Sequence, residues 1–358
     1  MPAENEIGVT RIKVIGMGGG GSNAVARMYR ERIQGVEYAV VNTDSQALLR
    51  CDVPLRIRIG DKLTRGMGVG GDPEVGKQAA EESKDELRQV VQDADMVFIA
   101  AGMGGGTGTG TAPTVADLAK EAGALTIAVV TKPFAFEGGQ RRKQAEKGIQ
   151  WLKDKVDTLI VIPNERLMAS CGVEMPVSQA FKMADDVLRQ GVQSIAELVT
   201  VAGEINLDFA DVKAIMKNAG PAWMAIGKGQ GENRAVDAAQ QALSSPLLDS
   251  TIEGAKGVIF NMTGGTDLKL SEVQAAAQVI NRAVDPEANI IFGMVNDPKM
   301  ENEVRITIIA TGFGSRESTD GQDDQVNKLL MEALGDESEL DLPPFLRRRR
   351  RRVGNNKY

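Results

Sequence analysis

Nine residues in the first third of the chain have the composition of a phosphate-binding loop. Six of the residues 102–110 are glycines, and Thr107 and Thr109 add hydroxyl groups. The segment follows an apolar run at 94–101, which predicts a buried strand, and precedes a helical pattern at 111–122. Free N–H groups at a helix start, beside residues without side chains, bind anionic oxygens. We therefore expect this loop to hold phosphate groups, and a flexible hinge is the simpler alternative.

A second glycine-rich segment follows the first predicted strand. It reads Gly-Met-Gly-Gly-Gly-Gly-Ser-Asn from Gly16 to Asn23, and the next predicted strand ends at Asn42, with Asp44 close behind. Gly-x-Gly-x-x-Gly with an acid about 20 residues later is the dinucleotide fingerprint, so a Rossmann-type oxidoreductase is the competing interpretation. That fingerprint does not call for a second glycine loop. Two such loops favour a di- or triphosphate held from two sides.

The residue inventory excludes several kinds of chemistry. The chain has no histidine and two cysteines, Cys51 and Cys171. Ser-His and Cys-His nucleophiles, histidine metal sites and a disulfide framework are therefore excluded. The sequence also contains no Gly-x-x-x-x-Gly-Lys-Ser/Thr segment. Carboxylates, amides, hydroxyls and the backbone are left to carry any reaction.

The glycine loops lie in an alternation of strand and helix patterns. Strands are predicted at 11–16, 38–42, 55–59, 94–101, 125–131 and 157–162, with helices at 23–32, 73–92, 111–122 and 139–155. This order predicts an α/β fold with a parallel sheet covered on both faces, whose ligands bind at the carboxyl ends of the strands. A long, broadly apolar helix is expected at 179–202. A smaller α+β domain follows, with strands at 223–227, 257–263, 290–295 and 305–310 and helices at 234–243 and 271–282.

Two motifs in combination resemble the FtsZ family, the bacterial cell-division GTPases related to tubulin. They are Gly-Gly-Gly-Thr-Gly-Thr-Gly at 104–110 and Asn-Leu-Asp-Phe-Ala-Asp at 206–211, and the likeness runs from residue 11 to about 313. It implies a Rossmann-like GTP-binding domain at 11–178, a central helix at 179–202, an α+β domain at 203–313 and a terminal peptide with a basic tip at 339–358. The polar composition of the remaining segments predicts a disordered arm at 1–10 and a linker at 314–338. The implied ligands are GTP or GDP with Mg²⁺, and K⁺ is a further candidate; no protein side chain is assigned to a metal.

The resemblance also assigns the nucleotide contacts. A third glycine-rich loop at 65–71 would lie by the γ-phosphate, and the other two glycine loops would hold the remaining phosphates. Glu137, Arg141 and Asn164 would contact the ribose and base region, and Asp185 would pair with the guanine edge. On chemistry alone, Glu137 and Arg141 form a surface ion pair and Asp185 is a solvated or capping acid. The predicted nucleotide-binding residues are Gly19, Gly20, Gly21, Ser22, Asn23, Asn42, Asp44, Gly70, Gly71, Gly102, Gly104, Gly105, Gly106, Thr107, Gly108, Thr109, Pro133, Glu137, Arg141, Asn164, Phe181 and Asp185.

Catalysis is assigned to a different part of the chain. Asp208 and Asp211 are three residues apart at the start of a predicted helix, where acids ordinarily act as caps. The resemblance makes them, with Asn206, the catalytic residues of a loop that acts on the GTP of a neighbouring subunit. Such a head-to-tail contact does not close and builds a filament, here the division ring.

The end of the chain combines apolar residues with a block of arginines. The last twelve residues carry seven of the 42 Lys and Arg and none of the 49 Asp and Glu, so the rest of the chain is more acidic than the net charge of −7. The resemblance implies that membrane-tethering division adaptors bind residues 341–352, from Asp341 to Arg352. The arginines from Arg347 to Arg352 would also attract anionic lipid. A solubilising or nucleic-acid-binding tail is the alternative, but the acidic body disfavours a specific nucleic-acid partner.

The sequence contains no signal peptide and no apolar run of the ~20 residues that span a bilayer. Together with the resemblance, this predicts a cytoplasmic protein at the midcell division site, on the inner face of the membrane.

Overall fold

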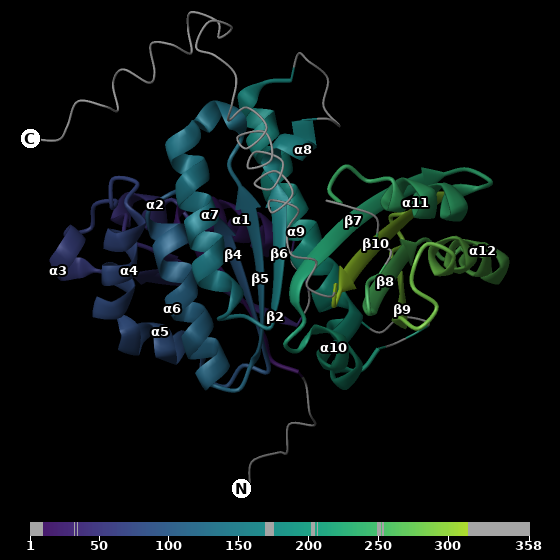
Figure 1. The fold of residues 1–358 in the computed structure, drawn as a ribbon, viewed down its shortest axis with the longest axis horizontal. Coiled ribbons are helices and arrows are strands. Elements are labelled where there is room, and N and C mark those ends of the chain that lie inside the picture. The colour runs from purple at the N-terminus through teal and green to yellow at the C-terminus, as the bar shows by residue number, and fades with distance from the viewer. Residues whose placement is uncertain are drawn as a thin grey trace, which may run out of the picture. The chain divides into compact units, whose positions relative to one another are not determined.

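The strands join into a ten-stranded sheet in the order β3-β2-β1-β4-β5-β6-β7-β10-β8-β9 (Figure 1). The structure, a computed structural model, describes residues 10–31, 33, 35–168, 175–201, 205, 207–248, 252 and 254–313. The predicted linker, the terminal peptide, Asn206 and all but Thr10 of the predicted arm lie outside these residues. No helix in the described part of the chain is long and apolar enough to cross a membrane.

The first half of the chain alternates strands and helices as predicted. Its elements are β1 (Ile12–Met17), α1 (Gly18–Glu31), β2 (Val36–Asn42), α2 (Ser45–Leu49), β3 (Leu55–Arg58), α3 (Asp61–Thr64), α4 (Pro73–Glu82), α5 (Lys84–Val91), β4 (Met96–Gly102), α6 (Thr107–Glu121), β5 (Leu125–Lys132), the 3-10 helix η1 (Ala135–Glu137), α7 (Gly139–Lys153), β6 (Thr158–Pro163) and α8 (Asn164–Met168). All neighbouring pairs among β1 to β6 are parallel. Their carboxyl ends therefore meet at one edge of the sheet.

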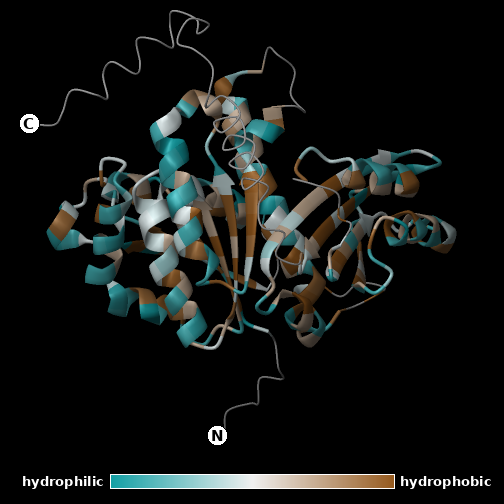
Figure 2. Ribbon diagram, in the orientation of Figure 1, coloured by the Kyte–Doolittle hydropathy of each residue, from teal (hydrophilic) through white to brown (hydrophobic). Residues whose placement is uncertain are grey.

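Both faces of the parallel sheet are buried, because each is covered by helices. Side chains alternate between the two faces along each strand. In β1, Ile12 and Val14 face a core shared with α1 and α9, whereas Ile15 and Met17 face a second core formed with α4 to α7. Figure 2 shows the central strands as largely hydrophobic and the outer surfaces of the covering helices as largely hydrophilic. This double burial explains the continuous apolar runs that predicted the strands.

The second half of the chain begins with the long helix. Its elements are α9 (Val177–Thr200), α10 (Phe209–Met216), β7 (Gly220–Gln230), α11 (Arg234–Leu243), β8 (Gly257–Gly264), α12 (Leu270–Asn281), β9 (Asn289–Asn296) and β10 (Glu303–Thr311). Strand β10 pairs antiparallel with both β7 and β8, and β8 pairs parallel with β9. Strand β7 also continues the parallel sheet through a short pairing with β6, in which Ile160 lies opposite Ala222.

Helix α9 packs against both halves of the sheet. Leu188, Val192 and Ile195 lie in one apolar core with Val129 of β5 and Met224 of β7. The apolar residues around much of this helix are explained by burial on two sides. Its carboxyl-terminal part therefore holds the two halves of the sheet together, while its first turns lie near the carboxyl edge of β5 and β6.

Two helices begin earlier than their sequence patterns predicted. Helix α1 begins at Gly18 and α6 at Thr107, inside the two glycine loops. Glycine has low helix propensity, which hid these first turns from the sequence pattern. The free N–H groups of both helices consequently lie at the carboxyl edge of the sheet. The single helix predicted at 73–92 is interrupted at Ser83, whose hydroxyl accepts a hydrogen bond from the Gly60 N–H (3.1 Å).

Candidate functional site

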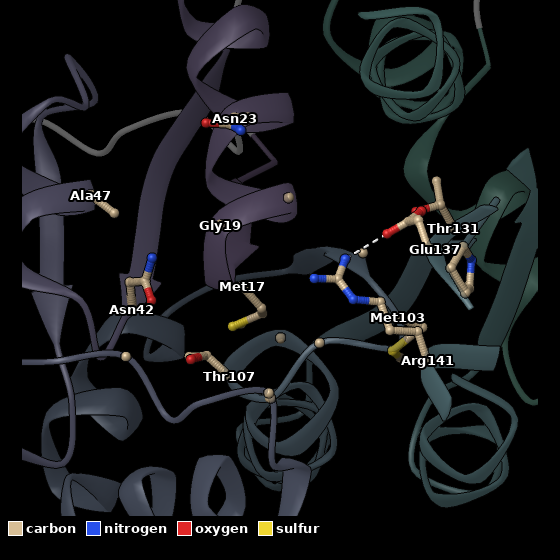
Figure 3. Close-up of a pocket in the computed structure, with 18 of the residues that line it drawn as sticks. Met17, Gly19, Asn23, Asn42, Ala47, Met103, Thr107, Thr131, Glu137 and Arg141 are labelled. Carbon is tan, nitrogen blue, oxygen red and sulfur yellow. Dashed lines mark hydrogen bonds and ion pairs between the residues drawn. The ribbon is translucent and has the colours of Figure 1, made fainter. Parts of the chain in front are cut away.

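A cavity of about 620 Å³ lies at the carboxyl ends of β1, β2, β4, β5 and β6. Figure 3 shows Asn42 and Thr107 on one side of it and Glu137 and Arg141 on the other. The residues that line the cavity are Met17, Gly19, Gly20, Asn23, Asn42, Asp44, Ala47, Gly68, Val69, Gly70, Gly71, Gly102, Met103, Gly105, Gly106, Thr107, Gly108, Thr131, Pro133, Glu137, Arg141, Asn164, Phe181, Ala184, Asp185 and Leu188. The structure thus gathers most of the predicted nucleotide-binding residues around one cavity.

Four predicted residues lie outside this lining. Gly21 packs against β4, where a β-carbon would collide with the Ala100 carbonyl oxygen. Gly104 donates its N–H to the Thr109 hydroxyl (2.9 Å), and Thr109 is fully buried. Ser22 is buried and lines a neighbouring cavity. In this structure these four residues contribute to the conformation and packing of the loops without lining the cavity. The Thr109 hydroxyl does not face the cavity.

The glycines of the loop at 102–110 serve two different purposes. A β-carbon on Gly106 would lie 2.9 Å from the Asp72 N atom, and one on Gly108 would lie 2.9 Å from the Met17 carbonyl oxygen. These two positions permit close backbone packing. A β-carbon on Gly105 would meet no protein atom within 4 Å, although Gly105 lines the cavity. Its lack of a side chain leaves space for a ligand.

The hydroxyl of Thr107 reaches the cavity from the first turn of α6. It is 3.0 Å from the Thr43 hydroxyl, and Thr43 is fully buried at the end of β2. The two hydroxyls share one hydrogen bond, which fixes the Thr107 rotamer. Sequence analysis did not select Thr43, although its place directly after a strand would have justified it.

Acids and amides line the ends of β2 and β6. Asp44 caps α2 by accepting hydrogen bonds from the N–H groups of Gln46 (2.8 Å) and Ala47 (3.3 Å). Asn164 is buried at the start of α8, and its Oδ1 has no hydrogen-bond partner among the described residues. A buried amide oxygen without a partner is costly, so this atom is suited to accept a hydrogen bond from a ligand hydroxyl.

The wall formed by η1 and α7 carries an ion pair. Arg141 donates to Glu137 at 2.6 Å, as expected for residues one helical turn apart (Figure 3). The other Glu137 oxygen accepts the Phe134 N–H at 3.0 Å. Glu137 is therefore held firmly, while the guanidinium stays half exposed, with 57% of its side chain accessible.

Three aromatic rings lie together beside the first turns of α9, and one of them, Phe181, lines the cavity. Phe181 is 41% exposed and meets Phe134 edge-on, with ring centroids 5.4 Å apart. Phe134 in turn stacks on Phe136. An aromatic side chain with an open face at a cavity suits a planar heterocycle.

Asp185 lies opposite α1, with 17% of its side chain exposed. Burial raises its pKa to about 6, although the nearby Arg27 charge opposes this shift. The Arg27 Nε atom is 3.2 Å from the Asp185 Oδ2 atom. A carboxylate in such a place is suited to accept hydrogen bonds from two N–H donors of a ligand.

The structure adds lining residues that the sequence analysis did not select. They are Met17, Ala47, Gly68, Val69, Met103, Thr131, Ala184 and Leu188. Met17, Met103 and Thr131 sit at or directly beyond strand ends, so the carboxyl-end rule would have found them. Ala184 and Leu188 lie on α9 beside Phe181 and Asp185, which the resemblance had already assigned to the nucleotide site.

The predicted catalytic acids lie at the opposite edge of the parallel sheet. Asp208 and Asp211 form a capping box at the start of α10, in which Asp208 Oδ1 accepts the Asp211 N–H at 2.8 Å. Helix α10 ends beside the amino end of β6, where the Thr158 hydroxyl donates to the Met216 carbonyl oxygen (2.5 Å). Figure 1 shows α10 near the lower edge of the sheet and α8 near its upper edge. Both acids are exposed and lie outside the cavity lining.

The cavity residues suit a nucleotide better than a metal centre. Open glycine backbone, two helix N-termini and the unpaired Asn164 oxygen fit phosphates and a sugar. No group of three or more His, Cys, Asp or Glu side chains that could hold a metal ion occurs in the described ranges. Any cation bound here would take most of its ligands from phosphates and water.

Comparison with known proteins identifies the family. Residues 11–172 match the Tubulin/FtsZ family GTPase domain, and residues 220–314 match the FtsZ family C-terminal domain. FtsZ from M. jannaschii, solved as an empty dimer, is 48% identical, with a TM-score of 0.83 over 86% of this chain and 89% of that one. The chain belongs to the FtsZ family. This assignment confirms the predicted family and its mostly parallel sheet with a following C-terminal domain.

More distant relatives of FtsZ share the fold. CetZ1 from Haloferax volcanii, solved as a GDP-bound monomer, is 22% identical, with a TM-score of 0.75 over 91% of this chain and all of that one. CetZ2 from the same organism, solved as a GTPγS-bound protofilament, is 19% identical, with a TM-score of 0.72 over 90% of this chain and 99% of that one. At these identities the likeness concerns the fold alone.

Membership of the FtsZ family gives the activity in outline. The chain is a cytoskeletal GTPase that binds GTP and GDP, with a role in cell division. The predicted GTPase activity is thus confirmed, and the oxidoreductase alternative finds no support in these matches. The roles of individual residues stay predictions.

Proposed function

We propose that this FtsZ-family GTPase assembles head to tail and hydrolyses GTP only between two subunits. The observation that carries the proposal is the separation of its two sets of functional residues. The cavity lies at the carboxyl edge of the sheet, whereas Asp208 and Asp211 are exposed beyond its amino edge. A subunit cannot bring these acids to its own nucleotide, but a stacked neighbour can. FtsZ from M. jannaschii has been solved as a dimer, which supports self-association.

In the proposed complex the two glycine loops hold the phosphates. The N-termini of α1 and α6 direct free N–H groups and positive dipole ends at them, and the Thr107 hydroxyl adds a donor. Asn164 accepts from a ribose hydroxyl through its unpaired Oδ1 atom. Phe181 flanks the base, and Asp185 accepts hydrogen bonds from its Watson–Crick edge. Adenine lacks the ring N–H that guanine offers there, so this arrangement selects GTP.

Hydrolysis then needs few chemical groups. The neighbour's Asp208 and Asp211, with Asn206, orient a water molecule in line with the γ-phosphate. The amides of the glycine loops stabilise the negative charge that spreads over the transferred group. Positioning supplies most of the rate, so a chain without histidine can catalyse the reaction.

We also propose that a divalent cation accompanies the nucleotide. Mg²⁺ would neutralise phosphate charge when bound, and the Asp44 carboxylate and the Thr107 hydroxyl are oxygen donors in the cavity lining that could contribute to holding it. K⁺ is a candidate second ion. Phosphate release measured with and without chelator, and in KCl against NaCl, tests both ions.

The terminal peptide completes the proposal. Residues 341–352 combine Leu342, Phe345 and Leu346 with six arginines, a composition that suits docking on a membrane-tethering adaptor and attraction to anionic lipid. This would place the filaments at the inner face of the membrane at midcell. Co-sedimentation with vesicles of anionic and neutral lipid, using the full chain and a chain ending at 340, tests the lipid part.

The experiment that tests trans hydrolysis is phosphate release against protein concentration. Catalysis between subunits requires turnover per molecule to rise steeply above a threshold concentration. Turnover per molecule that stays constant down to demonstrably monomeric protein would contradict the proposal.

A further inference from the structure

A single ion pair connects α1 to the acid proposed to recognise the base. Arg27 Nε lies 3.2 Å from Asp185 Oδ2, with 34% of the Arg27 and 17% of the Asp185 side chain exposed. Asp185 lines both the nucleotide cavity and a neighbouring cavity of about 450 Å³. Arg27 lines only the neighbouring one. The guanidinium therefore approaches the carboxylate from the side away from the nucleotide.

The other charged groups nearby are engaged elsewhere. Arg30, on the same helix and lining the same neighbouring cavity, pairs with Asp52 at 2.8 Å. Arg189 of α9 pairs with Asp186 (2.8 Å) and with Glu31 (2.9 Å). The remaining ionisable groups facing this region are Arg50 and Cys51 in the neighbouring cavity and Asp44, Glu137 and Arg141 across the nucleotide cavity. Among the ion pairs of the described residues, Asp185 takes part in the one with Arg27.

Electrostatics make this pair important for the charge of Asp185. Burial raises the pKa of Asp185 to about 6, the positive charge of Arg27 lowers it, and the neighbouring Asp186 raises it. Removal of the Arg27 charge leaves only influences that raise the pKa. The carboxyl would then be protonated over more of the neutral pH range.

We propose that Arg27 is a positioning residue for base recognition, which keeps Asp185 ionised and fixes its orientation toward the nucleotide cavity. The inference rests on the proposed placement of guanine against Asp185. Guanine presents a ring N–H and an exocyclic amine, so its partner must accept two hydrogen bonds. An ionised carboxylate accepts both, whereas a protonated carboxyl carries a donor of its own and loses one of them. Arg27 thus acts through Asp185 without touching the base.

The test is the pH profile of GTP affinity. Kd is measured by calorimetric titration from pH 5.5 to 8.5 for the wild type, Arg27→Gln, Arg27→Lys and Arg30→Gln. The wild-type affinity should weaken below about pH 6, where Asp185 takes up a proton. In Arg27→Gln this midpoint should move up by about one pH unit, which makes binding about fivefold weaker than wild type at pH 6. The profiles should approach each other at pH 8.5.

Matched controls separate charge from structure. Arg27→Lys keeps a positive charge and should keep the wild-type midpoint. Arg30→Gln removes an arginine from the same helix and cavity, but one whose partner is Asp52, so it should also keep the midpoint. Titration of the GTP phosphates is common to all four proteins and cancels in the comparison. Arg27→Met, which retains the apolar stem, carries the same prediction as Arg27→Gln should the latter fold poorly.

Two outcomes would overturn the inference. One is an unchanged midpoint in Arg27→Gln or Arg27→Met. The other is an equal shift in Arg30→Gln, which would indicate a general effect of net charge. Failure of the wild type to bind GTP at every pH would contradict the proposed function itself, and the inference with it.

Discussion

Gly105, in the loop before α6, and Gly110, inside α6, should respond in opposite ways to substitution by alanine. A β-carbon on Gly105 would meet no protein atom within 4 Å, and Gly105 lines the nucleotide cavity. A β-carbon on Gly110 would lie 2.5 Å from the Lys77 N atom and 2.8 Å from the Gly76 carbonyl carbon, where α6 packs against α4. Gly105→Ala should therefore impair ligand binding, and Gly110→Ala should impair folding.

The expected magnitudes follow from these contacts. In Gly105→Ala the methyl group displaces a phosphate oxygen from one backbone N–H, and a hydrogen bond to a charged group contributes about 1.5–3 kcal/mol. GTP should then bind about ten- to a hundredfold more weakly, while stability stays equal or rises by about 0.5 kcal/mol. In Gly110→Ala two helix backbones must separate, so overpacking should cost about 3 kcal/mol. That is a large share of the roughly 5–15 kcal/mol that stabilises a typical domain.

Two assays distinguish the effects. Calorimetric titration with GTP gives Kd, and thermal unfolding followed by circular dichroism gives the melting temperature. The melting temperature of Gly110→Ala should fall by about 6–12 °C, and that of Gly105→Ala should not fall. Wild-type GTP affinity in folded Gly105→Ala would refute the placement of phosphate against this loop. A wild-type melting temperature in Gly110→Ala would refute the close contact between α4 and α6.

Three further predictions concern other parts of the molecule. Asp211→Ala should bind GTP normally and lose less than about 1 kcal/mol of stability, because Asp208 remains as the N-cap of α10 and only the 3.4 Å bond from the Asp208 N–H is lost. Its phosphate release should nevertheless fall at least a hundredfold, and weakened GTP binding would contradict this. Glu272→Gln should lower the free energy of unfolding by about 2 kcal/mol in urea titrations, because Arg234 is 4% exposed and would lose the negative charge and one of the two acceptor oxygens of Glu272, with GTP affinity as the unchanged control. Asn164→Ala should weaken the binding of GTP more than that of 2′,3′-dideoxy-GTP, since only GTP offers ribose hydroxyls to Oδ1. Equal losses of affinity for the two nucleotides would contradict the ribose contact.

Much of the fold could be predicted because its signals are local. The apolar runs at 125–131 and 157–162 indicated doubly buried strands, and these appear as Leu125–Lys132 and Thr158–Pro163. The glycine loops were visible for the same reason, since each directly follows a strand. Helix starts were less visible, because α1 and α6 begin on glycine and threonine, which favour a helix only weakly.

Contacts across long stretches of sequence could not be predicted. The Thr43 and Thr107 hydroxyls that share a hydrogen bond are 64 residues apart, and Arg27 meets Asp185 between two helices that are distant in the chain. Periodicity reports which face of an element is buried, but not which side chain it meets there. The short pairing of β6 with β7, which extends the parallel sheet into the second half, is another such contact.

Mixing two impaired variants, at a GTP concentration too low to load Gly105→Ala, is the most direct test of hydrolysis between subunits. Asp211→Ala keeps a complete nucleotide cavity, while Gly105→Ala keeps both acids of α10. When the two proteins are combined above the assembly threshold, an intact cavity can meet intact acids, so phosphate release should exceed the sum of the separate rates. Release equal to that sum, with co-assembly verified by sedimentation, would contradict catalysis by a neighbouring subunit.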